Sequence, residues 1–154
     1  MSGRTNGNGK AAPPLASRHR GREAAVQMLY QWEVGRLALA DVRRVWPEVT
    51  DEDEPLPDDL ATFAHSLAEG VAAHVAELDP LISEAAAHWR LERMNVVDRL
   101  VMRLAVYEFL YERDTPATVI INEALELARA FSSEEAVPFV NGVLDGIRRR
   151  LERS

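Results

Sequence analysis

The sequence contains no cysteine, so it can form neither a disulfide framework nor a thiolate-based catalytic or metal site. No apolar run approaches the roughly 20 residues that a membrane-spanning helix requires. The N-terminal residues 1–16 lack the apolar core of a secretory signal. These three absences lead us to expect a cytoplasmic protein.

Motifs of the common enzyme classes are also missing from the sequence. The chain has no glycine-rich phosphate loop and no nucleophile elbow, and it lacks the His-Glu-x-x-His and Glu-x-x-His patterns of metal sites. Histidine–carboxylate pairs do occur at helical spacing, namely His65 with Glu69, His74 with Glu77, and Glu84 with His88. None of these pairs is a complete ligand set. We therefore expect no enzyme, no catalytic residue, no metal and no cofactor.

Lysine is almost absent, because Lys10 is the only one among 18 basic residues and the others are arginines. The formal net charge is −7, yet residues 1–44 hold eight basic and three acidic side chains, whereas residues 45–154 hold ten basic and 22 acidic ones. A surface for a phosphate-bearing partner is therefore expected near the N-terminus. Arginine binds phosphate in two places and stacks on bases, which favours RNA, although a GC-rich genome would produce the same bias.

What the sequence does contain is helical periodicity. Apolar residues recur at three-and-four spacing along most of the chain, and no segment alternates over more than a few positions as a strand does. We predict an all-α single compact domain of about seven helices at 17–152, preceded by a disordered arm at 1–16. The predicted helices span about 17–34, 41–46, 58–78, 81–90, 95–111, 116–131 and 136–151.

Several of these bounds come from capping residues. Ser17 is expected to cap the first helix and Gly35 to stop it. Asn95 is expected to begin the central helix, while Asp79-Pro80 is expected to open the helix before it. Thr118 is a candidate cap for the sixth helix. Pro47 is expected to end the second helix, and residues 48–57 read as an acidic, solvated loop to which we assign no function.

Residues 116–147 carry the clearest pattern, two amphipathic helices joined by a polar corner at 132–135. The apolar stripe of the first helix consists of Ile120, Ala124, Leu127 and Phe131, flanked by Ile121, Leu125 and Ala128. The corner offers hydroxyl caps and negative charge to the next helix, and Pro138 lies in that helix's first turn. This pattern predicts a helical hairpin that closes a core, with Leu104 of the central helix fully buried.

Three sequence blocks in order carry a resemblance to a known family. The blocks are REAAVQMLYQW at 22–32, RLVMRLAVYE at 99–108, and INEALELA at 121–128 followed by FVNGVLD at 139–145. Together they resemble the NusB family of bacterial transcription antitermination factors. The resemblance implies a helical bundle that binds the boxA element of nascent ribosomal RNA together with the small-subunit ribosomal protein NusE. It also implies a complex with other Nus factors that helps RNA polymerase read through terminators.

RNA-contacting residues are expected first at the start of the chain's first helix. Arg18, Arg20 and Arg22 lie where the helix dipole disfavours positive charge, which suggests that a negatively charged partner offsets the cost. Gln27 and Tyr30 lie off the apolar stripe and could contact bases by hydrogen bonding and stacking. Two alternatives stay open. The three arginines can form a solvated basic start of the helix without a partner, and Tyr30 can pack in the protein core instead of contacting RNA.

The resemblance adds two further surfaces. Its second RNA-facing part is the corner that includes Glu135 and Phe139, although Ala136, Val137 and Pro138 stand where polar or basic residues are common, which weakens this expectation. Its surface for the ribosomal protein falls on His88, Trp89, Arg90, Glu92, Arg93 and Arg99.

Two other functions stay open at this point. One is the RNA-binding part of a ribosomal RNA cytosine methyltransferase, which would need a cofactor-binding domain after it. The other is a helical protein-interaction module without RNA binding. Self-association as a homodimer also stays open.

Overall fold

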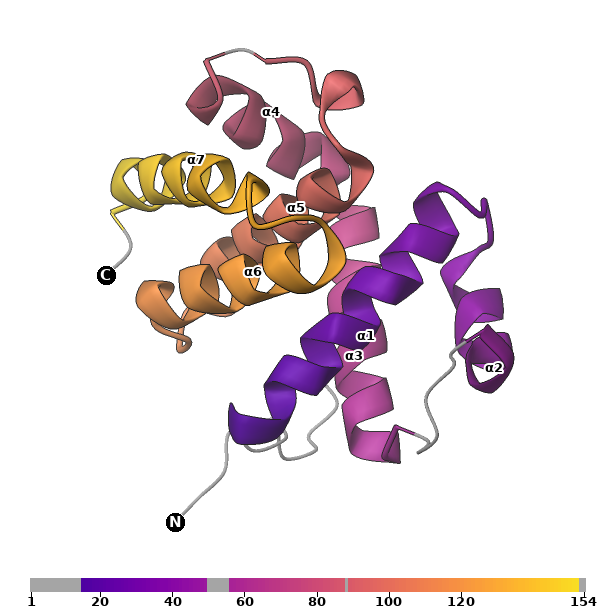
Figure 1. The fold of residues 1–154 in the computed structure, drawn as a ribbon. Coiled ribbons are helices and arrows are strands. Elements are labelled where there is room, and N and C mark those ends of the chain that lie inside the picture. Colours follow the sequence, from indigo (N-terminus) through magenta and orange to yellow (C-terminus); the bar gives the residue numbers. More distant parts are fainter. Residues whose placement is uncertain (1–14, 50–55, 88, 153–154) are drawn as a thin grey trace. The chain divides into compact units, whose positions relative to one another are not determined.

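The computed structural model describes residues 15–49, 56–87 and 89–152, and the described part contains helices and no strand (Figure 1). In chain order these helices are α1 (Leu15–Glu33), α2 (Leu39–Val49), α3 (Asp58–Ala73), α4 (Val75–Ala85), the short 3-10 helix η1 (Leu91–Arg93), α5 (Val96–Tyr111), α6 (Ala117–Phe131) and α7 (Ala136–Arg150). The all-α prediction with seven α-helices is confirmed. No helix in the described residues is long and apolar enough to cross a membrane.

Residues 1–69 form the first of two compact units. In this unit α1 packs on α2. α1 also approaches α3 at Gly21, where a Cβ atom added to the glycine would lie 2.6 Å from the Phe63 ring. The missing side chain at Gly21 is what allows this approach. The Arg18 guanidinium lies 5.8 Å from the centroid of the same ring, within the range of a cation–π contact. His65 of α3 contacts the Leu39 carbonyl at the start of α2, with Nε2 at 3.2 Å from the oxygen.

Residues 70–154 form the second unit, in which α4, α6 and α7 all contact α5. α7 also contacts α4 and α6 (Figure 1). The side chains buried along α5 lie around most of its circumference: Asp98, Leu100, Val101, Met102, Arg103, Leu104, Ala105, Val106, Glu108 and Phe109. The predicted burial of Leu104 is confirmed.

The predicted hairpin is present as α6 and α7. Its buried residues on α6 are Ala117, Ile120, Ile121, Ala124, Leu127 and Ala128. At the corner, the Ser133 hydroxyl accepts a hydrogen bond from the Ala136 backbone N–H at 3.2 Å. The N-cap position of α7 itself is held by Glu135, whose side chain makes no cap hydrogen bond. Pro138 lies in the first turn of α7, where a backbone N–H would have no intrahelical partner.

The boundary between α3 and α4 differs from the prediction. One helix over 58–78 is wrong, because α3 ends at Ala73 and α4 begins at Val75. At the break, the His74 ring Nδ1 donates to the Gly70 carbonyl at 2.7 Å, while the His74 backbone N–H turns to the Val71 carbonyl at 3.1 Å. The side chain thus replaces the backbone bond that a continuous helix would make.

The predicted opening of a helix at Asp79-Pro80 is also wrong, because both residues lie inside α4. Asp79 does not cap a helix. Its carboxylate instead accepts two hydrogen bonds of 2.8 Å from the buried guanidinium of Arg103 on α5. An aspartate before a proline resembles a cap in the sequence, and only the packing of α4 on α5 reveals its actual partner.

Two other expected helix ends need correction, and one is confirmed. α1 ends at Glu33, just before the expected stop at Gly35, and the left-handed residue beyond the helix is Arg36, with φ 56°. Ser17 does not cap α1, because α1 begins at Leu15 and includes it. α2 continues past Pro47 to Val49.

At α5 the predicted cap is confirmed, because Asn95 Oδ1 accepts from the backbone N–H groups of Val97 at 2.9 Å and Asp98 at 3.4 Å. At α6 it is wrong, because Pro116 holds the N-cap position and Thr118 lies inside the helix. Of the predicted disordered arm, residues 15 and 16 belong to α1, and residues 1–14 lie outside the described part. Residues 50–55 of the acidic loop also lie outside it.

Candidate nucleic-acid interface

One face of α1 carries three of the sequence-predicted RNA residues. Arg20, Gln27 and Tyr30 are separated by seven and three positions, so they follow one another along the same side of the helix. Arg20 and Gln27 are partly exposed, and Tyr30 exposes 40% of its surface. The alternative of a Tyr30 buried in the core does not fit this exposure. The face offers a cation, an amide and an aromatic ring in a row.

Arg18 and Arg22 lie on a different face of α1 and are buried, with only 4% and 2% of their surfaces exposed. They continue the spacing of the buried residues Ala25 and Leu29, at intervals of three or four positions. This spacing is visible in the sequence and could have located both arginines on the core side. Their RNA contact stays a prediction, and these side-chain positions do not favour it.

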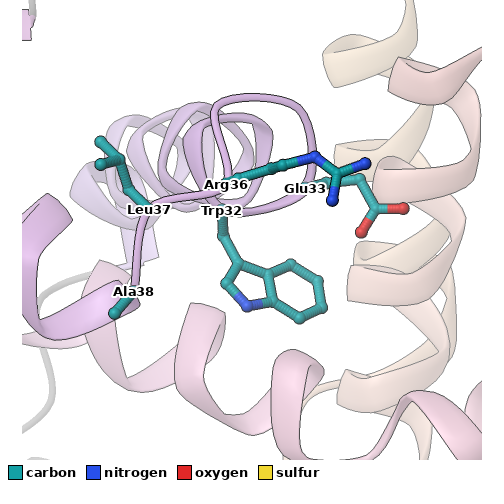
Figure 2. Close-up of a pocket in the computed structure, with 5 residues that line it drawn as sticks. All are labelled: Trp32, Glu33, Arg36, Leu37 and Ala38. Atoms are coloured by element: carbon teal, nitrogen blue, oxygen red, sulfur yellow. The ribbon is translucent and has the colours of Figure 1, made fainter.

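An open pocket of about 470 Å³ lies where α1 ends, lined by Trp32, Glu33, Arg36, Leu37 and Ala38. Figure 2 shows the Trp32 indole pointing from the helix into this pocket. The Arg36 side chain extends toward Glu33, and both lie on the same side of the indole (Figure 2). None of the sequence-predicted site residues lines it. Trp32 follows the buried residues Ala25, Met28 and Leu29 at helical spacing, so its partial exposure at this pocket is a feature that the periodicity does not reveal.

A second pocket, in the unit of residues 70–154, joins two segments to which the family resemblance assigns different partners. The Trp89 and Phe139 rings lie with their centroids 6.2 Å apart and their planes tilted by 60°. Both rings are exposed, Trp89 to 56%. They line a pocket of about 250 Å³ together with Arg93, Met94, Asn95, Asp98 and Ala136. We call it the Trp89 pocket.

Polar groups at the start of α5 also line the Trp89 pocket. Asp98 exposes 8% of its surface, and its Oδ1 atom accepts no hydrogen bond from any residue that the structure describes. Asn95 uses its Oδ1 for the helix cap, which leaves its amide Nδ2 as a donor. Burying a carboxylate oxygen without a donor is unfavourable, which makes Asp98 a candidate acceptor for a group bound in this pocket.

The remaining predicted residues lie near this pocket or on the surface around it. Glu135, Arg90 and Glu92 are exposed, and Glu135 is the N-cap residue of α7. Arg99 holds η1 by donating from Nη1 to the Leu91 carbonyl at 2.8 Å, so it also has a structural role. His88 lies outside the described residues. The sequence did not single out Met94, Asn95 or Asp98 for binding, because their place in the pocket depends on how the segment before α5 packs against the start of α7.

Among the residues that the structure describes, which do not include His88, no group of three or more potential metal ligands occurs. His65 Nδ1 lies 3.5 Å from Glu69. His74 instead joins an aromatic cluster, 4.5 Å from the Tyr111 ring. Tyr111 donates to Glu77 at 2.6 Å, and this hydrogen bond is the main reason that its pKa is raised above the ordinary value.

Comparison with known proteins agrees with the helical order and the sequence blocks. The model of the NusB family matches residues 19–149. The chain belongs to the NusB family. A relative from Solibacter usitatus named transcription antitermination protein NusB is 46% identical, over 89% of this chain and 92% of its own length. The NusB relative of the same name from Bacillus subtilis is 39% identical, over 89% of this chain and 98% of its own length.

Solved NusB structures share the fold. The structure of T. maritima NusB superposes with a TM-score of 0.73 at 36% identity, covering 90% of this chain and 92% of that one. A crystal structure of the antitermination factors NusB and NusE in complex with double-stranded RNA superposes with a TM-score of 0.76 at 24% identity, covering 89% of this chain and 99% of that one. The NusB relatives are named as antitermination factors and not as enzymes.

Proposed function

We propose that this chain is an RNA-binding antitermination factor that recognises a boxA-like single-stranded RNA. The observation that carries the proposal is the row of Arg20, Gln27 and Tyr30 along one face of α1. Single-stranded RNA is held by cations on phosphates, stacking on aromatic rings and hydrogen bonds to base edges, and this row offers one group of each kind. Family membership supports the same assignment, because the relatives are named for antitermination.

The ribosomal protein NusE is the proposed partner, as the family resemblance implies. Its proposed surface is the exposed part of the segment before α5, at Arg90 and Glu92. In the bound state other Nus factors and RNA polymerase would join the complex, which would help polymerase read through terminators.

The proposal favours antitermination over the other two readings. The relatives that the chain matches over 92% and 98% of their own length are named as antitermination proteins, which gives no support to a methyltransferase. The exposed Tyr30 ring next to Gln27 and Arg20 suits RNA better than a protein-interaction module without RNA binding.

A titration tests the proposal directly. The full chain is titrated into a fluorescent boxA-like RNA with and without NusE, at several salt concentrations, and a scrambled RNA of equal composition serves as the control. We expect binding that weakens with salt, and tighter binding of the boxA-like RNA than of the scrambled RNA when NusE is present. No binding under any condition, or equal affinity for both RNAs with NusE present, would overturn the proposal.

A further inference from the structure

The Trp89 pocket is lined by polar and aromatic side chains, and these features together restrict what it can hold. Asp98 Oδ1 is an acceptor that lacks a donor among the described residues. Asn95, three residues before Asp98, keeps its amide Nδ2 as a donor, because its Oδ1 caps α5. Trp89 and Phe139 add two exposed aromatic rings to the lining. Arg93 adds one positive charge to the lining.

A flat ligand with a hydrogen-bond donor and a hydrogen-bond acceptor on one edge fits the Asp98 acceptor, the Asn95 donor and the two aromatic rings. A charged amine or guanidinium from a protein would satisfy Asp98, but it would leave the Asn95 amide unused and would meet the like charge of Arg93. A nucleobase stacks on an aromatic ring and presents a hydrogen-bonding edge, while Arg93 can reach its phosphate. Asp98, Asn95 and Arg93 together therefore favour a nucleobase over a cationic protein side chain as the occupant of the pocket.

Asp98 also restricts the kind of base. An ionised carboxylate only accepts hydrogen bonds, so it favours an exocyclic amino group and repels a carbonyl oxygen. Cytosine and adenine each carry an amino donor beside a ring-nitrogen acceptor, whereas uracil carries the O4 oxygen in place of the amino group. The neighbouring acceptor of cytosine or adenine suits the Asn95 amide.

The size of the pocket agrees with a single base. Its volume of about 250 Å³ is below the roughly 300–1,000 Å³ of pockets that enclose a drug-sized ligand. Ala136 contributes only a methyl group to the lining.

We propose that the Trp89 pocket receives one unpaired base of the bound RNA and that Asp98 selects cytosine or adenine over uracil at that position. The inference rests on the proposed RNA-binding function and deepens it, because it names the residue that discriminates between bases. Trp89 is the stacking residue and Asn95 the second hydrogen-bonding residue of the site.

The test compares oligocytidylate, oligoadenylate and oligouridylate of equal length as probes for the full-length protein. We expect the wild type to bind the first two about 5- to 100-fold more tightly than oligouridylate, the range for a good base contact. Asp98→Asn should bring the three affinities close together, because the amide can also donate to a carbonyl oxygen. Asp114→Asn is the matched control, since Asp114 is exposed beyond α5 and does not line the pocket.

Two further variants distinguish a change in the pocket itself from a loss of folding as the cause of altered RNA binding. Trp89→Phe should reduce the change in tryptophan fluorescence on binding. Ala136→Leu should fill the pocket without removing any polar group and abolish the base preference. Melting followed by circular dichroism confirms that each variant is folded, and Ala136→Leu decides the matter if Asp98→Asn does not fold.

The outcomes that overturn the inference differ from those that overturn RNA binding as such. If the wild type binds RNA but Asp98→Asn and Ala136→Leu keep the wild-type base preference, the pocket does not read a base, and the proposed function still stands. If Asp98→Asn leaves base preference unchanged and weakens binding of NusE, the pocket holds a cationic protein side chain instead. If no RNA binds the wild type, both the function and the inference are wrong.

Discussion

Trp89 and Phe139 bring two distant segments of the chain into contact, with their ring centroids 6.2 Å apart. The family resemblance places Trp89 on the surface for a protein partner and Phe139 on a surface for RNA, yet both rings line one pocket together with Asp98. The two proposed binding surfaces therefore meet at this point of the second unit. A change here is expected to affect RNA binding and partner binding together.

Variants on the exposed face of α1 should separate the contribution of charge to RNA binding from the contribution of stacking. Arg20→Gln removes one phosphate contact, so the slope of log affinity against log salt should flatten by about 0.7 on a single-stranded RNA. Arg20→Lys keeps the charge and should keep the slope. A salt titration of both variants measures the difference, and an unchanged slope in Arg20→Gln would remove Arg20 from the interface.

Tyr30 is expected to act through its ring. Tyr30→Ala should weaken RNA binding by about 1–3 kcal/mol with little change in the salt slope, because stacking releases no counterions. Tyr30→Phe keeps the ring and is the matched control. Equal affinity of Tyr30→Ala and wild type for the boxA-like RNA would show that Tyr30 does not stack on a base.

The Asp79–Arg103 pair should be important for stability. Arg103 is buried, and both of its contacts with Asp79 measure 2.8 Å. Asp79→Ala leaves the buried guanidinium without this partner and should lower the free energy of unfolding by about 3–5 kcal/mol. Glu126→Ala removes the exposed pair with Arg129 and should cost less than about 1 kcal/mol. Urea denaturation compares the two, and equal losses would contradict the importance of the buried pair.

Leu104 tests the core of the second unit. Leu104→Ala should lower the free energy of unfolding by about 2–5 kcal/mol, because the buried side chain leaves a cavity. Thr118→Ala, at an exposed site that does not cap α6, should change it by less than about 0.5 kcal/mol. Urea denaturation measures both variants, and a loss in Leu104→Ala no larger than that in Thr118→Ala would contradict the burial of Leu104.

Asp145 should give a specific pH dependence. Its hydrogen bond with Arg148, aided by the charges of Arg148 and Arg149, holds the pKa of Asp145 below the ordinary value of 3.8. A lowered folded-state pKa stabilises the fold above pH 3.8, and this contribution is lost as the pH falls through the folded pKa. The stability difference between wild type and Asp145→Asn should therefore shrink as the pH falls below 3.8. A difference that stays constant with pH would exclude this role.

The sequence predicted the features that depend on local chemistry. Asn95 caps α5 because its side chain bonds to backbone groups two and three residues away, and the α6–α7 stripes follow from helical periodicity. The break at His74 was not predictable in this way, because the apolar spacing continues across it while a side chain replaces one backbone bond. Asp79 was assigned to a cap because its partner Arg103 lies on another helix.

The candidate site was predicted in part for similar reasons. The position of Arg22 on the buried stripe of α1 was readable from its spacing, but its charge suggested a surface role. The Trp89 pocket was not readable at all. It forms only when the segment before α5 packs near the start of α7, which brings Asp98 into one pocket with two rings that are far apart in the sequence.

The measurement that tests the central claim most directly is transcription through a terminator placed after a boxA-containing leader. The assay contains RNA polymerase, NusE and the other Nus factors, with or without the full chain, and a second template carries an altered boxA. The account predicts that adding the chain increases read-through on the boxA template and not on the altered one. Equal read-through with and without the chain on the boxA template, in an assay where another NusB protein raises it, would contradict the account.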